Sequence, residues 1–405
     1  MENALKILTV NAGSSSLKIV LFLLATPDNT QQRSYELTIT GIGQLLATAR
    51  VWSLDGEEYY QQQYIRDHAD AAQYCLKLLS KQLQSETIAA VGYRIVHGGQ
   101  RFAGPAVIDD EVLASIEALT PLNPQHAPTA IALIRTLRQQ LPNATHVACF
   151  DTAFFHDIPR VAQIVPIPRK YEAIGVRRYG FHGLSYSFLQ SAFEAQAGES
   201  AARGRVIYAH MGSGVSLAAT LDKQPVDMTM GFTPTSGVMM SSRPGDVDPA
   251  LERFLSQATG MQPAEYDYMI NYESGLLGIS ELSSDMLTLV NASDQNPQAK
   301  EAVDVFCYDI KKAIGALATT IGGIDSLIFS GGIGEQAPLI RQQICAGLDY
   351  LGITLDESAN HANAHLISAP GTQTGVHVMA TDEAASLAHD TSAILGQQHT
   401  EVAHA

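Results

Sequence analysis

Short apolar runs separated by small polar turns dominate this 405-residue chain. The run Ile7–Val10 predicts a buried strand, because it is apolar and rich in β-branched residues, and Leu17–Phe22 predicts its hairpin partner. The same arrangement returns at Val206–Leu221, where two apolar runs flank a Gly-Ser-Gly turn. The two segments begin 199 residues apart, at positions 7 and 206, which is about half the chain. This spacing predicts a duplicated domain.

Other apolar patterns predict helices alternating with strands. Apolar residues at helical spacing predict helices over 72–83, 127–141 and 301–321, and short apolar runs predict strands over 88–96 and 145–150. Helices that alternate with strands are typical of α/β architecture. We therefore expect two similar α/β halves with a ligand between them.

Three turns have the composition of phosphate-binding loops. The first is 11–16, followed by Lys18; the second is 212–214; the third is 331–335, after the apolar run 326–330. Backbone N–H groups on such turns form a concavity for anions, and lysine supplies a point charge. None fits the Walker A pattern, and each alone could be an ordinary turn. Together the three predict a nucleotide.

Composition narrows the partners. The chain has 41 acidic and 25 Lys or Arg residues, a net charge of −16, which argues against nucleic acid or an anionic membrane as a partner. In such an acidic protein, arginines beside glycine turns, such as Arg94 and Arg243, are candidates for binding an anion. Four cysteines lie far apart with no C-x-x-C, which predicts reduced core thiols. Without a signal-peptide pattern or an 18-residue apolar span, the expected location is the cytoplasm.

Eight motifs in order along the chain resemble those of the acetate kinase (acetokinase) and propionate kinase family of short-chain carboxylate kinases. They are NAGSSSLK at 11–18, RIVHGG at 94–99, FDTAF at 150–154, RYGFHG at 178–183, MGFTP at 230–234, SRPGDVDP at 242–249, GGIGE at 331–335 and TDE at 381–383. The resemblance implies a duplicated two-domain fold of the sugar kinase/Hsp70/actin type, with mixed sheets and an interdomain cleft. It implies an N-terminal domain over 1–153, joined by a C-terminal helix at about 385–405, a nucleotide-binding domain over 154–384, and a homodimer.

The implied reaction is ATP plus a short-chain carboxylate, acetate or propionate, giving an acyl phosphate and ADP. A carboxylate has a pKa near 4 and is ionised at pH 7, so the reaction needs no general base. The obstacle is the approach of an anion to a polyanion, which calls for positioning and charge neutralisation. The resemblance assigns this work to Mg²⁺ (or Mn²⁺) and to catalytic residues Asp151, Arg94, Arg243, His182 and Asn123.

In the resemblance, Arg243 holds the substrate carboxylate or the γ-phosphoryl group, Arg94 holds the opposite side, and His182 donates a hydrogen bond to the phosphoryl oxygens. The metal ligands are Asn11 and Glu383, and the small apolar acyl pocket is Val96, Leu122 and Pro234. The nucleotide-binding positions are Asn11, Ser14, Ser16, Lys18, His210, Gly212, Ser213, Gly214, Asp285, Gly331, Gly332, Ile333, Gly334 and Glu335. If the family resemblance is set aside, these residues are expected to form surface ion pairs, to cap helices or to belong to the hydrophobic core.

The sequence departs from the family pattern near these positions. Asn123 replaces a usual histidine, and His126, three residues on, can substitute for it. Leu184-Ser185-Tyr186 replaces Thr-Ser-His, and Leu287 stands where an arginine is common near the adenosine. Two alternatives therefore stay open: a divergent kinase with another acid or phosphoryl donor, and a non-catalytic nucleotide-binding protein. The charged residues Lys18, Arg94, Asp151, Arg243 and Glu383 are all present, which favours an active kinase.

Overall fold

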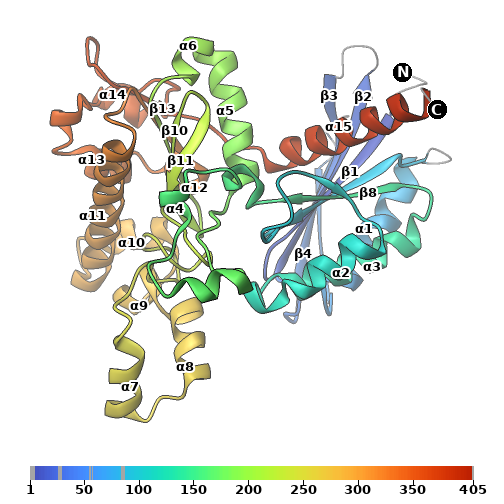
Figure 1. Cartoon of the computed structure of the whole chain (residues 1–405), viewed down its shortest axis with the longest axis horizontal. Helices are drawn as coiled ribbons and strands as arrows, with labels where there is room; N and C mark the ends of the chain where they lie inside the picture. Colours follow the sequence, from blue (N-terminus) through green and yellow to red (C-terminus); the bar gives the residue numbers. More distant parts are fainter. Residues whose placement is uncertain (1–4, 26–29, 54–55, 57, 84–86, 404–405) are drawn as a thin grey trace. The chain divides into compact units, whose positions relative to one another are not determined.

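The computed structural model describes residues 5–25, 30–53, 56, 58–83 and 87–403 (Figure 1). The chain divides into two compact units: the first runs to His156 and resumes at Asp382, and the second is Asp157–Thr381. Each unit contains a mixed sheet covered by helices, which confirms the predicted α/β class with mixed sheets.

The first unit is built on an eight-stranded sheet of order β5-β4-β3-β2-β1-β6-β8-β7. Strands β1, β6 and β8 are parallel to one another, and the other pairs are antiparallel. The strands are β1 Leu5–Ala12, β2 Ser16–Ala25, β3 Thr30–Thr40, β4 Ala47–Ser53, β5 Glu58–Gln63, β6 Ala90–Ile95, β7 Ala106–Val107 and β8 Thr145–Phe150. The helices are α1 His68–Leu83, α2 Asp110–Ala118, α3 Ala127–Gln140 and α15 Glu383–Ala403, with 3₁₀ turns at Thr120–Leu122 and Ala153–Phe155.

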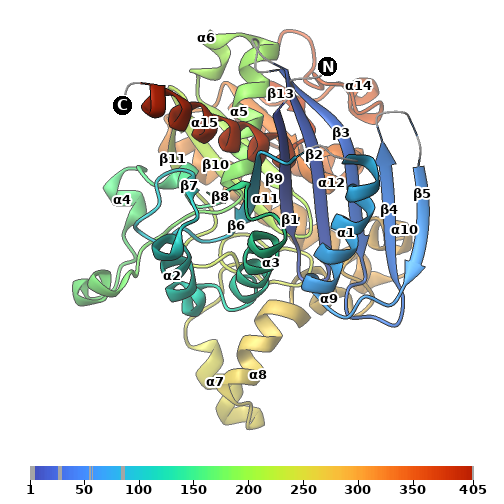
Figure 2. The ribbon, with the colours of Figure 1, turned by 90° about the vertical axis from the view of Figure 1, so that its right-hand side faces the viewer.

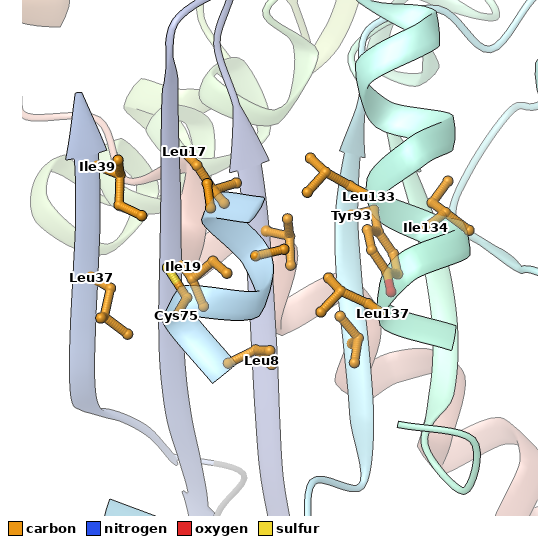
Figure 3. Packing of buried hydrophobic residues seen from close by; sticks show 14 of the residues in the cluster. Leu8, Leu17, Ile19, Leu37, Ile39, Cys75, Tyr93, Leu133, Ile134 and Leu137 are labelled. Carbon is orange, nitrogen blue, oxygen red and sulfur yellow. The ribbon is translucent and has the colours of Figure 1, made fainter. Parts of the chain in front are cut away.

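Both faces of the central strands are covered, which explains why they read as continuous apolar runs. Successive side chains of a strand point to opposite faces. Leu8 therefore joins the cluster beneath α1 and α3, whereas its neighbour Ile7 packs with Ala384 and Ala388 of α15 (Figures 2 and 3). This packing fixes the ends of β1, β6 and β8, from which polar side chains project.

The second unit has a five-stranded sheet of order β11-β10-β9-β12-β13. Its strands are β9 Val206–Met211, β10 Val215–Leu221, β11 Gln224–Met228, β12 Ser326–Ser330 and β13 Gly375–Val378. Its helices are α4 Arg160–Gln163, α5 Gly183–Ala197, α6 Glu199–Ala202, α7 Leu251–Thr259, α8 Pro263–Tyr268, α9 Gly275–Ser280, α10 Met286–Ala292, α11 Pro297–Thr320, α12 Gly331–Gln336, α13 Pro338–Cys345 and α14 Glu357–His361. Shorter helical segments lie at Arg169–Ile174, Met269–Glu273 and Asp349–Leu351.

The two sheets repeat one topology. In the first unit the order β3-β2-β1-β6-β8 has two antiparallel pairs followed by two parallel pairs, and β11-β10-β9-β12-β13 of the second unit has the same order and directions. The two hairpins that the sequence pairs, β1–β2 and β9–β10, occupy the same place in each. This is the duplication that their spacing predicts.

Most predicted elements are confirmed with shifted ends. The long helix predicted over 301–321 is α11, its apolar stripe is buried, and the strand predicted over 145–150 is β8. One prediction is corrected: 331–335 is not a turn before a helix, because it forms the short helix α12 itself. Strands β3, β4 and β5 were not predicted, since polar residues interrupt their apolar pattern. The four cysteines are buried and free, and no described helix is long and apolar enough to cross a membrane.

Candidate functional site

In the first unit, four predicted site residues meet where strand ends and the start of α15 converge. Arg94 of β6 holds Asp151, which follows β8: its Nη2 donates to Asp151 Oδ2 at 2.7 Å, and its Nε lies 3.1 Å from both carboxylate oxygens. Arg94 Nη1 is 3.3 Å from Glu383 Oε2 and donates to Asn11 Oδ1, also at 3.3 Å. Asn11 Nδ2 in turn donates to Glu383 Oε2 at 2.6 Å. The sequence separates these residues by up to 372 positions, and the fold joins them.

This Arg94 cluster (Asn11, Arg94, Asp151 and Glu383) is withdrawn from solvent. The exposed fractions of the side chains are 1% for Asp151, 16% for Glu383 and 18% for Arg94. Burial raises the pKa of the Asp151 carboxyl, and the Arg94 guanidinium opposes that shift. Burial also acts to lower the pKa of Arg94, but the Asp151 and Glu383 carboxylates outweigh it and raise that pKa. The contacts are those of an ionised pair, and two carboxylates against one guanidinium leave a net negative charge.

A small cavity adjoins the Arg94 cluster. Its volume is about 20 Å³, and its lining includes Arg94, Val96, Asn123 and His126. That is about the space of one water-sized group. The side chain of Asn123 is buried, with 5% of the residue exposed. Leu122 ends the neighbouring 3₁₀ turn and is half-buried, outside the residues that line this cavity.

The first predicted phosphate loop is the tight turn between β1 and β2. The Gly13 N–H donates to the Ser16 carbonyl, and His68 Nε2 contacts the Gly13 carbonyl at 2.9 Å. Ser14 is exposed and Ser16 half-buried. Lys18 of β2 forms an ion pair with Glu36 at 2.8 Å, so its ammonium group has a carboxylate partner inside the same unit.

In the second unit, His182 and Arg243 face the β9–β10 turn. A Cβ placed on Gly214 would lie 2.8 Å from Arg243 Nη2 and 3.2 Å from His182 Nε2, so both polar groups occupy the space that glycine leaves open. Arg243 Nη1 donates to the Pro234 carbonyl at 2.6 Å. Burial lowers the pKa of Arg243 to about 10, and among the described residues no carboxylate forms an ion pair with it. It is a half-buried cation, a group that can pair with an anion.

His182 is held in an unusual backbone conformation. Its φ is 60°, in the left-handed region that non-glycine residues rarely adopt, and it is the N-cap of α5. Its Nδ1 is 2.8 Å from Ser216 Oγ, and Ser216 Oγ is 2.6 Å from the buried Tyr186 hydroxyl. The ring of His182 lies 4.4 Å from that of His210, centroid to centroid.

His210 has a similar support. Its Nδ1 is 2.9 Å from Ser185 Oγ, which is 2.7 Å from Thr381 Oγ1. The Thr381 N–H and the Gly331 N–H both face Glu335 Oε1, at 3.3 and 2.9 Å. The Glu335 carboxylate therefore caps the start of α12. Gly331 is required there, because a Cβ would lie 2.8 Å from the Met211 backbone.

A pocket of about 760 Å³ opens beside the β9–β10 turn and α12. Five predicted nucleotide-binding residues line it: Gly212, Ser213, Asp285, Gly332 and Ile333. Its remaining lining is largely apolar and includes Leu287, at the position where the family often has an arginine. Asp285 is the N-cap of α10, and its hydrogen bonds with Thr288 lower its pKa. The volume suits a nucleotide-sized ligand.

Arg341 of α13 follows the pocket-lining Ile340 and is a buried structural residue that sequence reasoning missed. It is fully buried, and all its N–H groups go to neutral oxygens: Asn360 Oδ1 and O, Asn363 Oδ1, and the carbonyls of Gly334 and Glu335. Burial lowers its pKa to about 10. It ties the carboxyl end of α12 to α14. The sequence signal was a lone arginine within an apolar helix face.

The other missed residues are Tyr186 and Ser216, which stand behind His182. The signal for Tyr186 was its departure from the usual histidine, and that for Ser216 was its place after the second turn. The structure therefore gathers the predicted residues into two sets. Asn11, Arg94, Asp151, Glu383, Asn123 and Val96 lie together in the first unit, which also contains Ser14, Ser16, Lys18 and Leu122. The second unit contains His182, His210, Arg243, Pro234, Asp285, the turn 212–214 and the α12 residues 331–335.

Comparison with known proteins gives a consistent result. Residues 6–389 match the model of the acetokinase family. An acetate kinase of Rhodopseudomonas palustris strain TIE-1 is 39% identical over 382 residues, covering 93% of this chain and 95% of its own, and one of Clostridium botulinum strain Kyoto is 38% identical, covering 96% and 99%. The crystal structure of Porphyromonas gingivalis acetate kinase has a TM-score of 0.85 at 34% identity, covering 96% and 100%. That of a propionate kinase from Francisella tularensis has a TM-score of 0.89 at 30% identity, covering 96% and 99%.

Proposed function

Because the chain belongs to the acetokinase family, we propose that it transfers the γ-phosphoryl group of ATP to a short-chain carboxylate, giving an acyl phosphate and ADP. The observation that carries this proposal is the pair of donors at Gly214. A half-buried guanidinium without a carboxylate partner and a histidine nitrogen face one point beside a nucleotide-sized pocket. A non-catalytic nucleotide-binding protein would have no use for such a pair.

Arg243 and His182 are the proposed stabilisers of the migrating phosphoryl group. A guanidinium has the planar fork that matches phosphoryl and carboxylate oxygens, and it acts strongly where water is excluded. The loop Gly212–Gly214 and the start of α12 supply backbone N–H groups for the phosphate chain, and the apolar pocket wall supports the base. In these roles the side chains position and neutralise; none has to remove a proton from an ionised carboxylate.

The Arg94 cluster is the proposed metal site. Its two carboxylates and the Asn11 amide are hard oxygen donors with a net negative charge, which is the set that Mg²⁺ prefers, usually one or two carboxylates with phosphates and waters. Among the described residues no group of three or more His, Cys, Asp or Glu could hold a metal by itself, so the proposed site needs phosphates and waters as further ligands. When bound, Mg²⁺ would neutralise charge on the phosphates. Arg94 orients Asp151 and Glu383.

The cavity beside Val96 is the proposed acyl site. Its volume of about 20 Å³ accepts roughly one water-sized group, so a methyl group fits better than a longer chain. We therefore expect acetate to be preferred over butyrate. Each extra methylene changes binding by about 1–3 kcal/mol, so propionate should still react. Asn123, which lines this cavity, takes the place of the usual histidine as a hydrogen-bond donor.

The test is hydroxylamine trapping of the acyl phosphate, with ATP, Mg²⁺ and acids from formate to butyrate, and with GTP and pyrophosphate as alternative donors. The expected result is strong product with acetate and ATP. Arg243→Gln should lower kcat/KM by about 10² or more, by analogy with removed transition-state donors. The control Arg203→Gln removes an exposed, ion-paired arginine of the same unit and should leave the rate within twofold. Equal rates in both variants would contradict the assignment.

The metal role has a separate test. Glu383→Gln should raise the Mg²⁺ concentration needed for half-maximal activity, because it removes a charged ligand, and excess EDTA should abolish activity. The exposed Glu301→Gln is the control. An unchanged Mg²⁺ requirement in Glu383→Gln would rule out this ligand.

Two further parts of the proposal concern the whole protein. Its buried free thiols suit a reducing cytoplasm. The homodimer implied by the resemblance stays a prediction, which sedimentation equilibrium can test.

A further inference from the structure

A buried chain of hydroxyl groups lies behind His182. The Tyr186 hydroxyl is 2.6 Å from Ser216 Oγ, and Ser216 Oγ is 2.8 Å from His182 Nδ1. Tyr186 has no exposed surface, and Ser216 of β10 has 1%. His182 and Tyr186 belong to the start of α5, so the contact with β10 fixes the helix start against the sheet. The other ring nitrogen, Nε2, faces the point beside Gly214 where Arg243 also lies.

Counting the protons shows which group donates in each hydrogen bond of this Tyr186–Ser216–His182 series. A phenol is more acidic than an alcohol, so it is the stronger hydrogen-bond donor, and the Tyr186 oxygen also receives the backbone N–H of His210. Tyr186 therefore donates to Ser216. Burial raises the pKa of Tyr186, so the phenol keeps this proton. The single Ser216 proton has two neighbouring groups that could accept it, the Tyr186 oxygen and His182 Nδ1. Because Tyr186 is the donor in its bond with Ser216, the Ser216 proton goes to His182 Nδ1.

That direction decides which histidine nitrogen carries the proton. A neutral imidazole has one N–H and one lone pair, and the nitrogen that accepts a hydrogen bond is the one without the proton. With Nδ1 accepting from Ser216, the proton is on Nε2. An Nε2–H beside the Arg243 guanidinium presents two donors to a phosphoryl oxygen. The opposite tautomer would present a lone pair and repel that oxygen.

We propose that Tyr186, acting through Ser216, is a positioning residue that holds His182 as the Nε2–H tautomer facing the Arg243 guanidinium. The tautomer is a property of the free protein. Only its effect on the reaction rests on the proposed phosphoryl transfer. The position of Tyr186 is one at which the resembling family usually has histidine, which can lie in either tautomer. A phenol can donate at neutral pH but has no second nitrogen, so it sets a single direction.

The direct test is nitrogen NMR of the whole protein with ¹⁵N-labelled histidine, recorded at pH 8, above the ordinary histidine pKa of about 6.5. The His182 signals among the 13 histidines are assigned from their loss in His182→Gln. The expected spectrum shows a protonated Nε2 and an unprotonated Nδ1. A protonated Nδ1 in the wild-type protein would overturn the proposal.

The variants test the role of the phenol. In Tyr186→Phe no phenol donates to Ser216, so the serine hydroxyl can either donate to His182 Nδ1 or turn and accept from it, and the His182 spectrum should become a mixture of tautomers. The matched control is Tyr208→Phe, which removes another buried tyrosine hydroxyl of the same unit, from β9. Its His182 spectrum should match the wild type. A pure Nε2–H spectrum in Tyr186→Phe would overturn the role of Tyr186.

Kinetics supplies the second readout. The expected loss in Tyr186→Phe is about three- to tenfold in kcat, the effect of one hydrogen bond, with the KM for ATP changed less than twofold. Tyr186→His should restore part of kcat. A loss that appears only as a higher KM for ATP would contradict the proposal. If the wild-type protein makes no acyl phosphate while its spectrum shows the Nε2–H tautomer, the proposed function fails and the tautomer assignment stands.

Discussion

The buried His97 makes the stability of the first unit depend on pH in a calculable way. His97 lies just after β6, in the same motif as Arg94, and 2% of it is exposed. Its Nδ1 accepts a hydrogen bond from the Gly99 N–H at 2.9 Å. Burial lowers its pKa to about 4, from an ordinary value of 6.5. The folded protein therefore binds a proton at this ring only well below the pH at which the unfolded chain does.

The direction in which stability changes with pH follows from the linkage between proton binding and folding. Between pH 6.5 and about 4 the unfolded chain holds the proton and the folded chain does not, so acidification favours unfolding and stability rises with pH. The difference between the folded and unfolded pKa values of His97 corresponds to about 3 kcal/mol of folding stability, of which about 2 kcal/mol is lost by pH 5. His97→Asn keeps an oxygen that can accept from Gly99 but cannot take up the proton. Its stability should be lower at pH 8 but should fall less steeply toward pH 5.

The assay is urea unfolding followed by tryptophan fluorescence at pH 8, 6.5 and 5. The chain has one tryptophan, Trp52 in β4, so the signal reports the unit that contains His97. His146 is also buried in this unit with a lowered pKa, but it contributes equally to both proteins and cancels in the difference. If the free energy of unfolding fell by the same amount between pH 8 and pH 5 in the wild-type protein and in His97→Asn, the buried neutral His97 would not be the cause of the pH dependence.

Substitutions at Arg341 and Gly214 test two contacts of the second unit. Arg341→Met should lower the free energy of unfolding by roughly 3 kcal/mol, because it leaves buried oxygen acceptors without donors. The stability of Arg341→Lys should lie between those of the wild-type protein and Arg341→Met. Thermal unfolding followed by circular dichroism measures both variants, and an unchanged Tm in Arg341→Met would refute this role. Gly214→Ala should reduce kcat/KM at least tenfold with little change in Tm, because its methyl group would displace Arg243. Gly104→Ala, whose Cβ meets no atom within 4 Å, is the control, and equal activity of the two variants would show that the space at Gly214 is not needed.

The sequence by itself determined the elements and the duplication. Continuous apolar runs such as Ile7–Val10 predict strands buried on both faces, and the structure covers β1 with α15 on one face and with α1 and α3 on the other. The long apolar stripe of α11 was readable for the same reason. Strands β3 to β5 were not, because their polar residues obscure the alternation that a half-buried strand should show.

Motifs along the chain also determined the candidate residues, but only the tertiary structure decided their partners. Arg94 and Arg243 look alike in the sequence, as single arginines beside glycines. Folding places Arg94 against Asp151 and Glu383, and it leaves Arg243 without a carboxylate partner among the described residues. Such partners are far apart in the sequence, so no local pattern records them.

The same reason explains the residues that were missed. Tyr186 could be read as a departure from a family pattern, and Arg341 as a polar interruption of an apolar helix face, but neither showed what it contacts. Tyr186 reaches His182 through a serine of another strand, and Arg341 joins three segments through neutral oxygens. Hydrogen-bond direction and burial arise when strands and helices pack. A sequence therefore determines which groups are available, and the packed fold decides which atoms they meet.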